Sequence, residues 1–237
     1  MQLYTHAYGT GSSRIALLHG ISGDHEMFAD LTGLLTARGN SVIGVDLRGH
    51  GKSPRGDSYR IEDFASDLVE TLPTGLDAVI GHSLGARVLL AAADRLAPRR
   101  AIYLDPAWHV RGMLDARGMH ANVGEHPDGS AFTRSELAAL NPLWGTENLL
   151  RAQRSHARWD AGMLAAISSM VDEQEFVVPV AQRPSLVIYG GRSPLYAAAP
   201  VDQIRAAGYE IRIQEGAAHN IHLDDAEATM RCLEGWI

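Results

Sequence analysis

Cysteine and lysine are almost absent from this chain of 237 residues. Cys232 is the only cysteine, so an intrachain disulfide cannot form and a metal site built from several thiolates is excluded. Lys52 is the only lysine, and 21 basic residues face 28 acidic ones, which gives a formal net charge of −7. Proteins that bind nucleic acids usually carry a basic surplus. We therefore expect no nucleic-acid partner.

Long apolar runs are also missing. No stretch reaches the 18 or so consecutive apolar residues of a transmembrane helix. The first 14 residues lack the basic patch and apolar stretch of a signal peptide. These absences predict a cytoplasmic protein without a membrane partner. No feature points to a nucleotide or a metal, so we expect no cofactor, and the sequence leaves the oligomeric state open.

Short apolar runs alternate with longer stretches of helical periodicity. Most of these runs are continuously apolar, which is typical of strands buried on both faces of a parallel sheet. The order of elements predicts an α/β fold, a doubly wound and mostly parallel sheet with helices on both faces. The expected strands span 14–19, 41–46, 77–82, 100–105, 185–190 and 209–214, with a possible antiparallel edge strand near 2–8. The expected helices span 24–38, 61–72, 84–97, 198–207 and 223–235.

The alternation of strands and helices breaks between residues 106 and 183. This stretch has helix-like patterns at 134–140 and 146–171 and no convincing strand. We predict that residues 1–105 and 184–237 form the α/β core and that 106–183 is an inserted helical lid. The lid would cover the C-terminal edge of the sheet, where open α/β sheets bind their ligands.

Residues 81–85, Gly-His-Ser-Leu-Gly, fit the pattern G-x-S-x-G. They lie between an expected strand and an expected helix, which is the setting of a nucleophile elbow. Gly81 and Gly85 would let strand and helix approach closely, because they lack a Cβ atom. The helix N-terminus would direct N–H groups at a developing oxyanion. Ser83 is therefore the candidate nucleophile; the alternative is a serine helix cap with packing glycines.

The candidate oxyanion hole lies in two loops. One donor is expected from the backbone N–H of Leu84, the residue after the nucleophile. The other is expected from Ile21, in the glycine-containing segment 19–23 after the first buried strand. The alternative for this segment is an ordinary strand-to-helix loop.

A serine hydroxyl needs a base to become a good nucleophile. His219 is the best placed of eleven histidines, because it follows the last expected strand and can reach the sheet's C-terminal edge. His222 is the alternative, although we expect it to open the last helix. His19 and His50 follow strands and could line the pocket.

Four segments carry a resemblance to a known family: HGISG (19–23), DLRGHGKS (46–53), GHSLG (81–85) and GAAHNIHLD (216–224). Their order and spacing resemble the α/β-hydrolase superfamily, and the likeness covers nearly the whole chain outside the lid. It looks closest to the small lid-bearing esterase and lactonase-like members. The resemblance implies a serine nucleophile but no particular substrate, since similar members include esterases, lipases, carbon–carbon bond hydrolases, cofactor-free haloperoxidases and lyases.

The sequence departs from this family at the acid. Ser193 occupies the place of the usual aspartate, and a serine cannot carry the charge that stabilises an imidazolium. Asp105 is the leading substitute because it ends the expected strand 100–105, although Asp before Pro is also a common turn former. Asp202 is a further alternative. The last possibility is that no acid exists, which leaves a Ser–His dyad or an inactive scaffold.

Two other motifs suggest a phosphate-binding loop and a metal site, but neither pattern is complete. GHGKS (49–53) is similar to the end of a phosphate-binding loop, but Asp46 stands where that loop needs glycine. The spacing of His219 and His222 lacks a third metal ligand and the usual glutamate. We therefore expect a serine hydrolase that cleaves an ester or related acyl bond through an acyl-enzyme. The alternative is a non-hydrolytic protein of the same fold, either a lyase or a ligand-binding relative.

An apolar acyl compound of small or medium size is the expected substrate, because large apolar side chains cluster in the lid and the first loop. Any one of them could instead pack against other lid residues. The expected pocket residues are Met27, Phe28, Trp108, Trp144 and Met163, with Met113, Met119, Leu143 and Met170 as further candidates.

Overall fold

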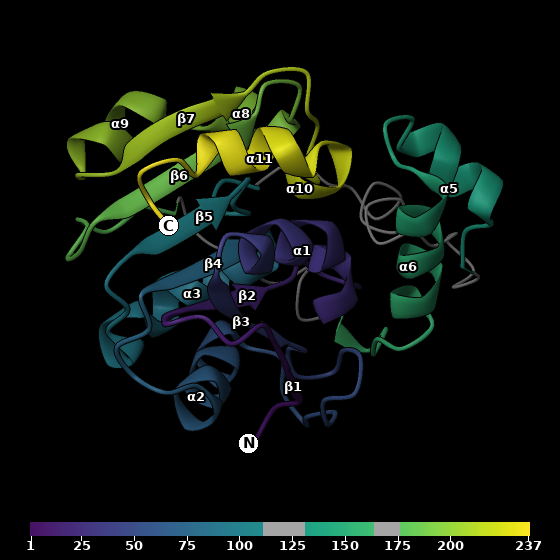
Figure 1. Ribbon diagram of the computed structural model, residues 1–237, viewed down its shortest axis with the longest axis horizontal. Coiled ribbons are helices and arrows are strands. Elements are labelled where there is room, and N and C mark those ends of the chain that lie inside the picture. The colour runs from purple at the N-terminus through teal and green to yellow at the C-terminus, as the bar shows by residue number, and fades with distance from the viewer. Residues whose placement is uncertain (111–130, 164–175) are drawn as a thin grey trace.

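The computed structural model describes residues 1–110, 131–163 and 176–237, and these form one sheet flanked by helices (Figure 1). The sheet has seven strands in the order β1-β3-β2-β4-β5-β6-β7. All neighbours pair in parallel except β1, which runs antiparallel to β3 at the edge. The predicted α/β fold and its antiparallel edge are thus confirmed. The strands are β1 (Thr5–Tyr8), β2 (Ser13–Leu18), β3 (Asn40–Val45), β4 (Ala78–His82), β5 (Ala101–Leu104), β6 (Ser185–Gly190) and β7 (Glu210–Gln214).

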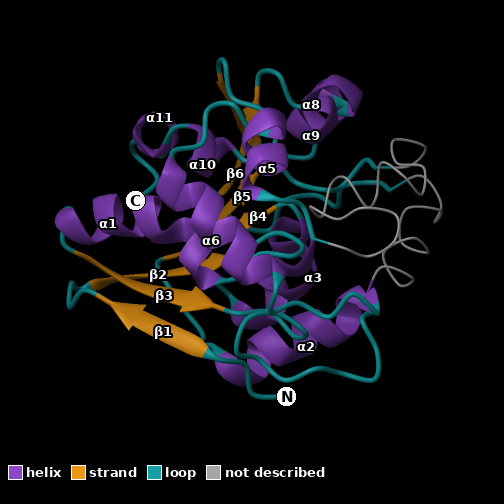
Figure 2. Cartoon of the chain, turned by 90° about the vertical axis from the view of Figure 1, so that its right-hand side faces the viewer, coloured by secondary structure: helices purple, strands orange, loops and turns teal. Residues whose placement is uncertain are grey.

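Helices cover both faces of the sheet (Figure 2). Helices α2 (Ile61–Thr71) and α3 (Leu84–Leu96) pack on one face, and α1 (Ala29–Ala37) and α11 (Ala226–Cys232) pack on the other. Because side chains alternate along a strand, β2 directs Ala16 and Leu18 into the first layer and Ile15 and Leu17 into the second, all fully buried. This burial on both faces explains why the strands read as continuous apolar runs.

The topology places a crevice at the C-terminal ends of β2 and β4. From β2 the chain crosses to β3 on one side, and later strands build outward from β4 on the other side. Strand order therefore reverses between β2 and β4, and ligands of open α/β sheets bind at such a point. The loop after β2 and the elbow after β4 flank this crevice.

Two helices of the predicted lid segment lie beside each other, away from the sheet (Figure 1). Helix α5 (Arg134–Leu140) begins at a capping box in which Thr133 and Glu136 satisfy each other's backbone N–H groups. Helix α6 (Thr146–His156) ends well before the predicted residue 171. The prediction that this helix continues past residue 156 is wrong for the described residues, which extend to 163. The chain instead turns back onto the core, where the Asp160 N–H donates to the Gly49 carbonyl at 2.7 Å. Residues 164–171 lie outside the described residues.

The C-terminal helix predicted at 223–235 is interrupted. Asp225 is extended, with φ −159° and ψ 97°, and its side chain accepts from the Ala228 N–H to cap α11. The segment before it is the short helix α10 (Ile221–Asp224). The remaining short helices are η1 (His25–Phe28), α8 (Pro194–Ala198) and α9 (Val201–Ala206). None of the helices in the described ranges combines the length and apolarity needed to cross a bilayer.

Candidate active site

Ser83 stands on a strained turn between β4 and α3. Its backbone has φ 52° and ψ −112°, a region that non-glycine residues rarely adopt. The turn is tight enough to require both flanking glycines: a Cβ on Gly81 would lie 2.5 Å from the Gly85 carbonyl oxygen, and one on Gly85 would lie 2.3 Å from the Leu18 carbonyl oxygen. This close packing fixes the serine at the N-terminus of α3, as expected from the motif.

A continuous chain of hydrogen bonds links three side chains from three loops. The Oγ of Ser83 lies 3.0 Å from Nε2 of His219, and Nδ1 of His219 lies 2.6 Å from Oδ2 of Asp105. A carboxylate can only accept from this ring, so the proton of a neutral His219 is on Nδ1 and Nε2 is free to accept from the serine. The side chain of His219 is 20 % exposed, whereas Asp105 is fully buried. The structure therefore brings the three sequence-predicted residues together.

Asp105 is held in place by further hydrogen bonds besides the one to His219. It follows β5 with φ 40°, and its Oδ1 accepts from the Gly190 N–H at 3.0 Å. The hydroxyl of Ser193 donates to Oδ2 at 2.6 Å and also accepts from the Leu195 N–H, which caps α8. Ser193, the residue in place of the usual acid, thus contacts the substitute acid directly.

The other candidate acid lies elsewhere. Asp202 is in the first turn of α9, and its side chain is fully exposed beside Arg205. It does not contact His219. Asp105 is the only carboxylate within hydrogen-bond distance of that ring in the part of the chain that the structure describes.

The segment 19–23 is held against the elbow. A Cβ on Gly20 would come within 2.8 Å of Nδ1 of His82 and 3.2 Å of Cβ of Ser83. Ser22 has a positive φ of 55°, and its N–H donates to Nε2 of His50 at 3.2 Å. No hydrogen bond from the N–H of Ile21 or Leu84 to another described group is seen. Within the described residues, both N–H groups are thus without an acceptor, as expected of oxyanion-hole donors.

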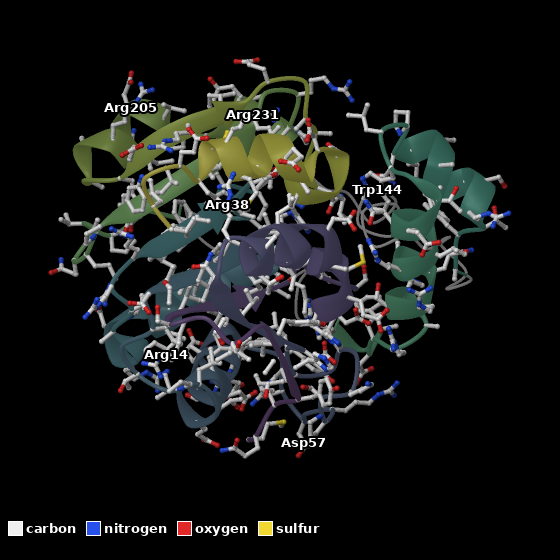
Figure 3. All side chains as sticks on the ribbon, in the orientation of Figure 1. Arg14, Arg38, Asp57, Trp144, Arg205 and Arg231 are labelled. Carbon is white, nitrogen blue, oxygen red and sulfur yellow. The ribbon has the colours of Figure 1, made fainter. Side chains whose placement is uncertain are left out.

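A cavity of about 490 Å³ opens beside Ser83 and His219. Its walls come from segment 19–23, from α5 and α6, and from the loop before α10. Met27 and Trp144 line it as expected. The indole N–H of Trp144, labelled in Figure 3, donates to Asp224 at 3.0 Å, so the segment between α5 and α6 contacts the end of α10. Ser83 thus faces a space large enough for a small organic molecule.

Comparison with known proteins identifies the family. The sequence profile described as the alpha/beta hydrolase family matches residues 15–231, almost the whole chain. The chain belongs to the α/β-hydrolase family. The sheet order, the strained elbow and the loop positions of the three linked residues agree with this membership.

Named relatives of this α/β-hydrolase include esterases and other hydrolases. The chain is 28% identical over 253 residues to esterase YbfF of Escherichia coli, with 95% of this chain and 93% of that protein covered. It is 27% identical to 2-(acetamidomethylene)succinate hydrolase of Mesorhizobium japonicum, with 96% and 89% covered. The crystal structure of the N-formylmaleamic acid deformylase of Pseudomonas putida S16 superposes with a TM-score of 0.75 at 23% identity, covering 98% and 96%. The named sequence relatives support a hydrolase.

Three expected pocket residues are instead part of the core of this α/β-hydrolase. Phe28 is 1% exposed in the layer under α1 and α11 and stacks on His222. Trp108 is 1% exposed between Tyr103 and Tyr209, and Met163 is fully buried in the same layer. None of the three lines the cavity. The prediction was wrong because apolar character does not reveal which way a side chain points. Leu143 is exposed, and Met113, Met119 and Met170 lie outside the described residues.

His19 and His50 do not line the cavity either. The Leu47 N–H donates to Nε2 of His19 at 2.9 Å, and the ring of His50 lies edge-on to His19. Both are buried supports for the loops after β2 and β3. Burial lowers the pKa of His50 to about 3, so this ring is neutral near pH 7.

His82 and His222 line the cavity, which sequence reasoning missed. Nε2 of His82 donates to the backbone carbonyl of His219 at 3.0 Å. The ring of His82 lies 4.8 Å from that of His219 and 4.7 Å from that of His222, between centroids. His82 occupies the variable slot of the elbow motif, so the pattern gave no signal for it. His222 was considered only as an alternative base and a helix start.

One buried group in the described ranges has metal-ligand types close together: Asp24, His25 and Asp46. Its atoms are already engaged. Asp46 accepts from the backbone and ring nitrogens of His25 and from the Lys52 N–H, and Asp24 accepts from the Glu26 N–H and pairs with Arg158. This group therefore serves as a hydrogen-bonded link between loops.

Proposed function

We propose that this α/β-hydrolase is a serine hydrolase that cleaves an ester or related acyl bond through an acyl-enzyme. The nucleophile is Ser83, the general base and acid is His219, and Asp105 orients the imidazole. The observation that supports this most is the hydrogen-bonded series from Ser83 through His219 to Asp105. Such a series makes a serine hydroxyl reactive at neutral pH.

In the first half of the reaction, Nε2 of His219 takes the hydroxyl proton as Oγ of Ser83 attacks the substrate carbonyl carbon. The carbonyl π electrons move to oxygen, and the N–H groups of Ile21 and Leu84 stabilise the resulting oxyanion. The imidazolium is stabilised by the buried Asp105 carboxylate. When the tetrahedral intermediate collapses, His219 gives its proton to the departing alcohol and the acyl group stays on Ser83.

In the second half, water repeats these steps on the acyl-enzyme. His219 removes a proton from the water as its oxygen attacks the acyl carbon. The same two N–H groups stabilise the second oxyanion. His219 then returns a proton to Oγ as the carboxylic acid leaves, so the enzyme is regenerated.

An uncharged acyl compound of small or medium size fits the cavity. Apart from histidines, the described lining residues carry no ionisable side chain. Large apolar side chains line part of the cavity beside the polar Asn141, Gln153, Ser155 and His156, and they are Met27, Phe132, Leu137, Leu140 and Trp144. Apolar surface of this kind favours an alkyl or aryl group of the substrate.

The alternative, a non-hydrolytic protein of this fold, rests on the serine at position 193. The contacts of Ser193 weaken that motive, because its hydroxyl supports a carboxylate that bonds His219. The hydrolase names of the sequence relatives also favour hydrolysis.

Labelling with a fluorophosphonate tests the activated serine. We expect stoichiometric modification at Ser83, no modification of Ser83→Ala, and no hydrolysis of p-nitrophenyl acetate by that variant. Ser185→Ala is the matched control, since Ser185 is a buried serine at the opposite end of the sheet, in the first position of β6. The control should label at the wild-type rate. Full turnover by a folded Ser83→Ala protein would reject the proposal.

A further inference from the structure

We infer that His82 and His222 form a donor–acceptor subsite of the cavity that receives an uncharged carboxamide-like group of the acyl substrate. The inference rests on the proposed hydrolase function and narrows its substrate class. Both side chains line the cavity that contains Ser83, and both are nearly buried, with 4% and 2% exposure.

His222 offers a hydrogen-bond donor. Its Nδ1 is sealed from solvent and has no partner among the described residues. If this nitrogen carried the proton, its N–H would have lost its hydrogen bond to water without gaining an acceptor, which costs more free energy than leaving a lone pair unpaired. The proton of the neutral ring is therefore on Nε2. Because the ring lines the cavity, the Nε2–H is the group that can meet a ligand there.

His82 offers an acceptor. Its Nε2 donates to the carbonyl oxygen of His219, so the proton of its neutral ring is on Nε2 and Nδ1 carries a lone pair. Nδ1 lies on the side of Gly20, another residue of the cavity wall, as the 2.8 Å approach of a hypothetical Gly20 Cβ shows. One ring thus presents an acceptor and its neighbour presents a donor, with 4.7 Å between their centroids.

Both rings are uncharged near neutral pH. Burial lowers the pKa of His222 to about 3, and the neighbouring His219 adds to the effect. Burial, His222 and His219 lower the pKa of His82 well below its usual value. The described cavity wall contains no arginine or lysine. At these two rings a substrate carboxylate would therefore lose its water without gaining a cation, whereas an amide would exchange water for a matched donor and acceptor.

The inferred substrate group differs from the acidic compounds for which two of the chain's matches are named. One sequence relative is named for a succinate, and one solved structure is named for a maleamic acid. We infer that the present chain does not favour such acidic compounds. The short spacing from His219 to His82 to His222 also places the polar group close to the reacting carbonyl.

Three methyl esters of the same size test the inference. Methyl succinamate carries a terminal amide, monomethyl succinate carries an isosteric carboxylate, and methyl 4-methylpentanoate carries an isosteric isopropyl group. Hydrolysis is followed by pH-stat or by methanol release. We expect kcat/KM for the amide to exceed that for the carboxylate by on the order of 100-fold, because an unpaired charge is costly to bury.

The role of His222 is read from a ratio within each variant. In His222→Phe, which keeps an aromatic ring against Phe28, the ratio of kcat/KM for methyl succinamate to that for methyl 4-methylpentanoate should fall about 3- to 10-fold. In His222→Gln, which restores an N–H donor near the Nε2 position, the ratio should recover. A general loss of folded enzyme lowers both rates equally and leaves the ratio unchanged.

The outcomes separate this inference from the proposed function. If the parent protein hydrolyses methyl 4-methylpentanoate and Ser83→Ala does not, the proposed hydrolase function is supported. A carboxylate rate within about 5-fold of the amide rate, or a ratio that His222→Phe does not change, then overturns the subsite alone. If no ester is hydrolysed, binding to Ser83→Ala is measured by saturation-transfer NMR. Binding of the amide but not the carboxylate supports the subsite, and equal binding of both overturns it.

Discussion

Moving the acid from position 105 to position 193 should first destroy and then partly restore activity. In Asp105→Asn, the amide oxygen can still accept from the Gly190 N–H, but the amide NH₂ would then face the Nδ1–H of His219, which is also a donor. That contact favours the wrong imidazole tautomer and removes the charge that stabilises the imidazolium. Loss of a triad carboxylate in this way costs about 10⁴ in kcat.

Ser193 is positioned to take over. Its Oγ is one 2.6 Å hydrogen bond from Oδ2 of Asp105, which is one 2.6 Å hydrogen bond from His219. An aspartate at 193 would extend a carboxylate toward the same ring. Aspartate is also as good a helix cap as serine, so α8 should remain intact. We expect the double variant Asp105→Asn/Ser193→Asp to recover about tenfold or more over Asp105→Asn alone.

The assay is kcat/KM for p-nitrophenyl acetate, with thermal unfolding to confirm that each variant is folded. Asp202→Asn is the matched control: its carboxylate is fully exposed in α9, so we expect activity within about twofold of the parent. If folded Asp105→Asn retains more than about a tenth of the parent activity, the catalytic role of Asp105 is refuted. Failure of the double variant would instead show that position 193 cannot reach the ring.

Two further predictions concern stability. Gly85→Ala should lower the free energy of unfolding by more than about 2 kcal/mol, because its Cβ would lie 2.3 Å from the Leu18 carbonyl oxygen. Gly33→Ala is the matched control in α1: its Cβ would meet nothing within 4 Å, so this variant should be neutral or stabilising. Equal melting temperatures of the two variants would contradict this prediction. Burial alone would raise the pKa of Asp46, but hydrogen bonds from His25 and backbone N–H groups lower it to about 2. Because the folded pKa lies below the unfolded value, Asp46 contributes about 2 kcal/mol above pH 4 that is lost as pH falls toward 2. Urea unfolding at pH 2 to 5 should therefore show a shallower acid slope in Asp46→Asn, and identical slopes would exclude this source.

The sheet and the elbow could be predicted from the sequence because both leave local signals. Continuous apolar runs such as 14–19 arise from burial on both faces, and the glycines around Ser83 arise from a turn with no room for a Cβ. Asp105 was also predicted, since it ends the expected strand 100–105, but its contact with His219 depends on residues 114 positions apart. Sequence could not reveal that Ser193 supports it.

The pocket was predicted less well, for a physical reason. Hydrophobicity shows that Trp108 and Met163 are buried but not whether they face a cavity or the core. Polar cavity residues such as His82 and His222 were missed because they have no distinctive spacing. Helix ends were misjudged at His156 and Asp225, where tertiary contacts and a side-chain cap end the helices.

The first residues of the predicted lid, directly after Asp105, are hydrogen-bonded to the elbow itself. Asp105 donates its N–H to the Ile188 carbonyl at 2.7 Å, and two residues later the Ala107 N–H donates to the Ser83 carbonyl at 3.3 Å. Anyone who grafts a different insertion onto this scaffold therefore has to join it beyond residue 107. A junction even a few residues earlier would replace residues that are bonded to the elbow together with the predicted lid, and a change in selectivity could not then be distinguished from a displaced Ser83.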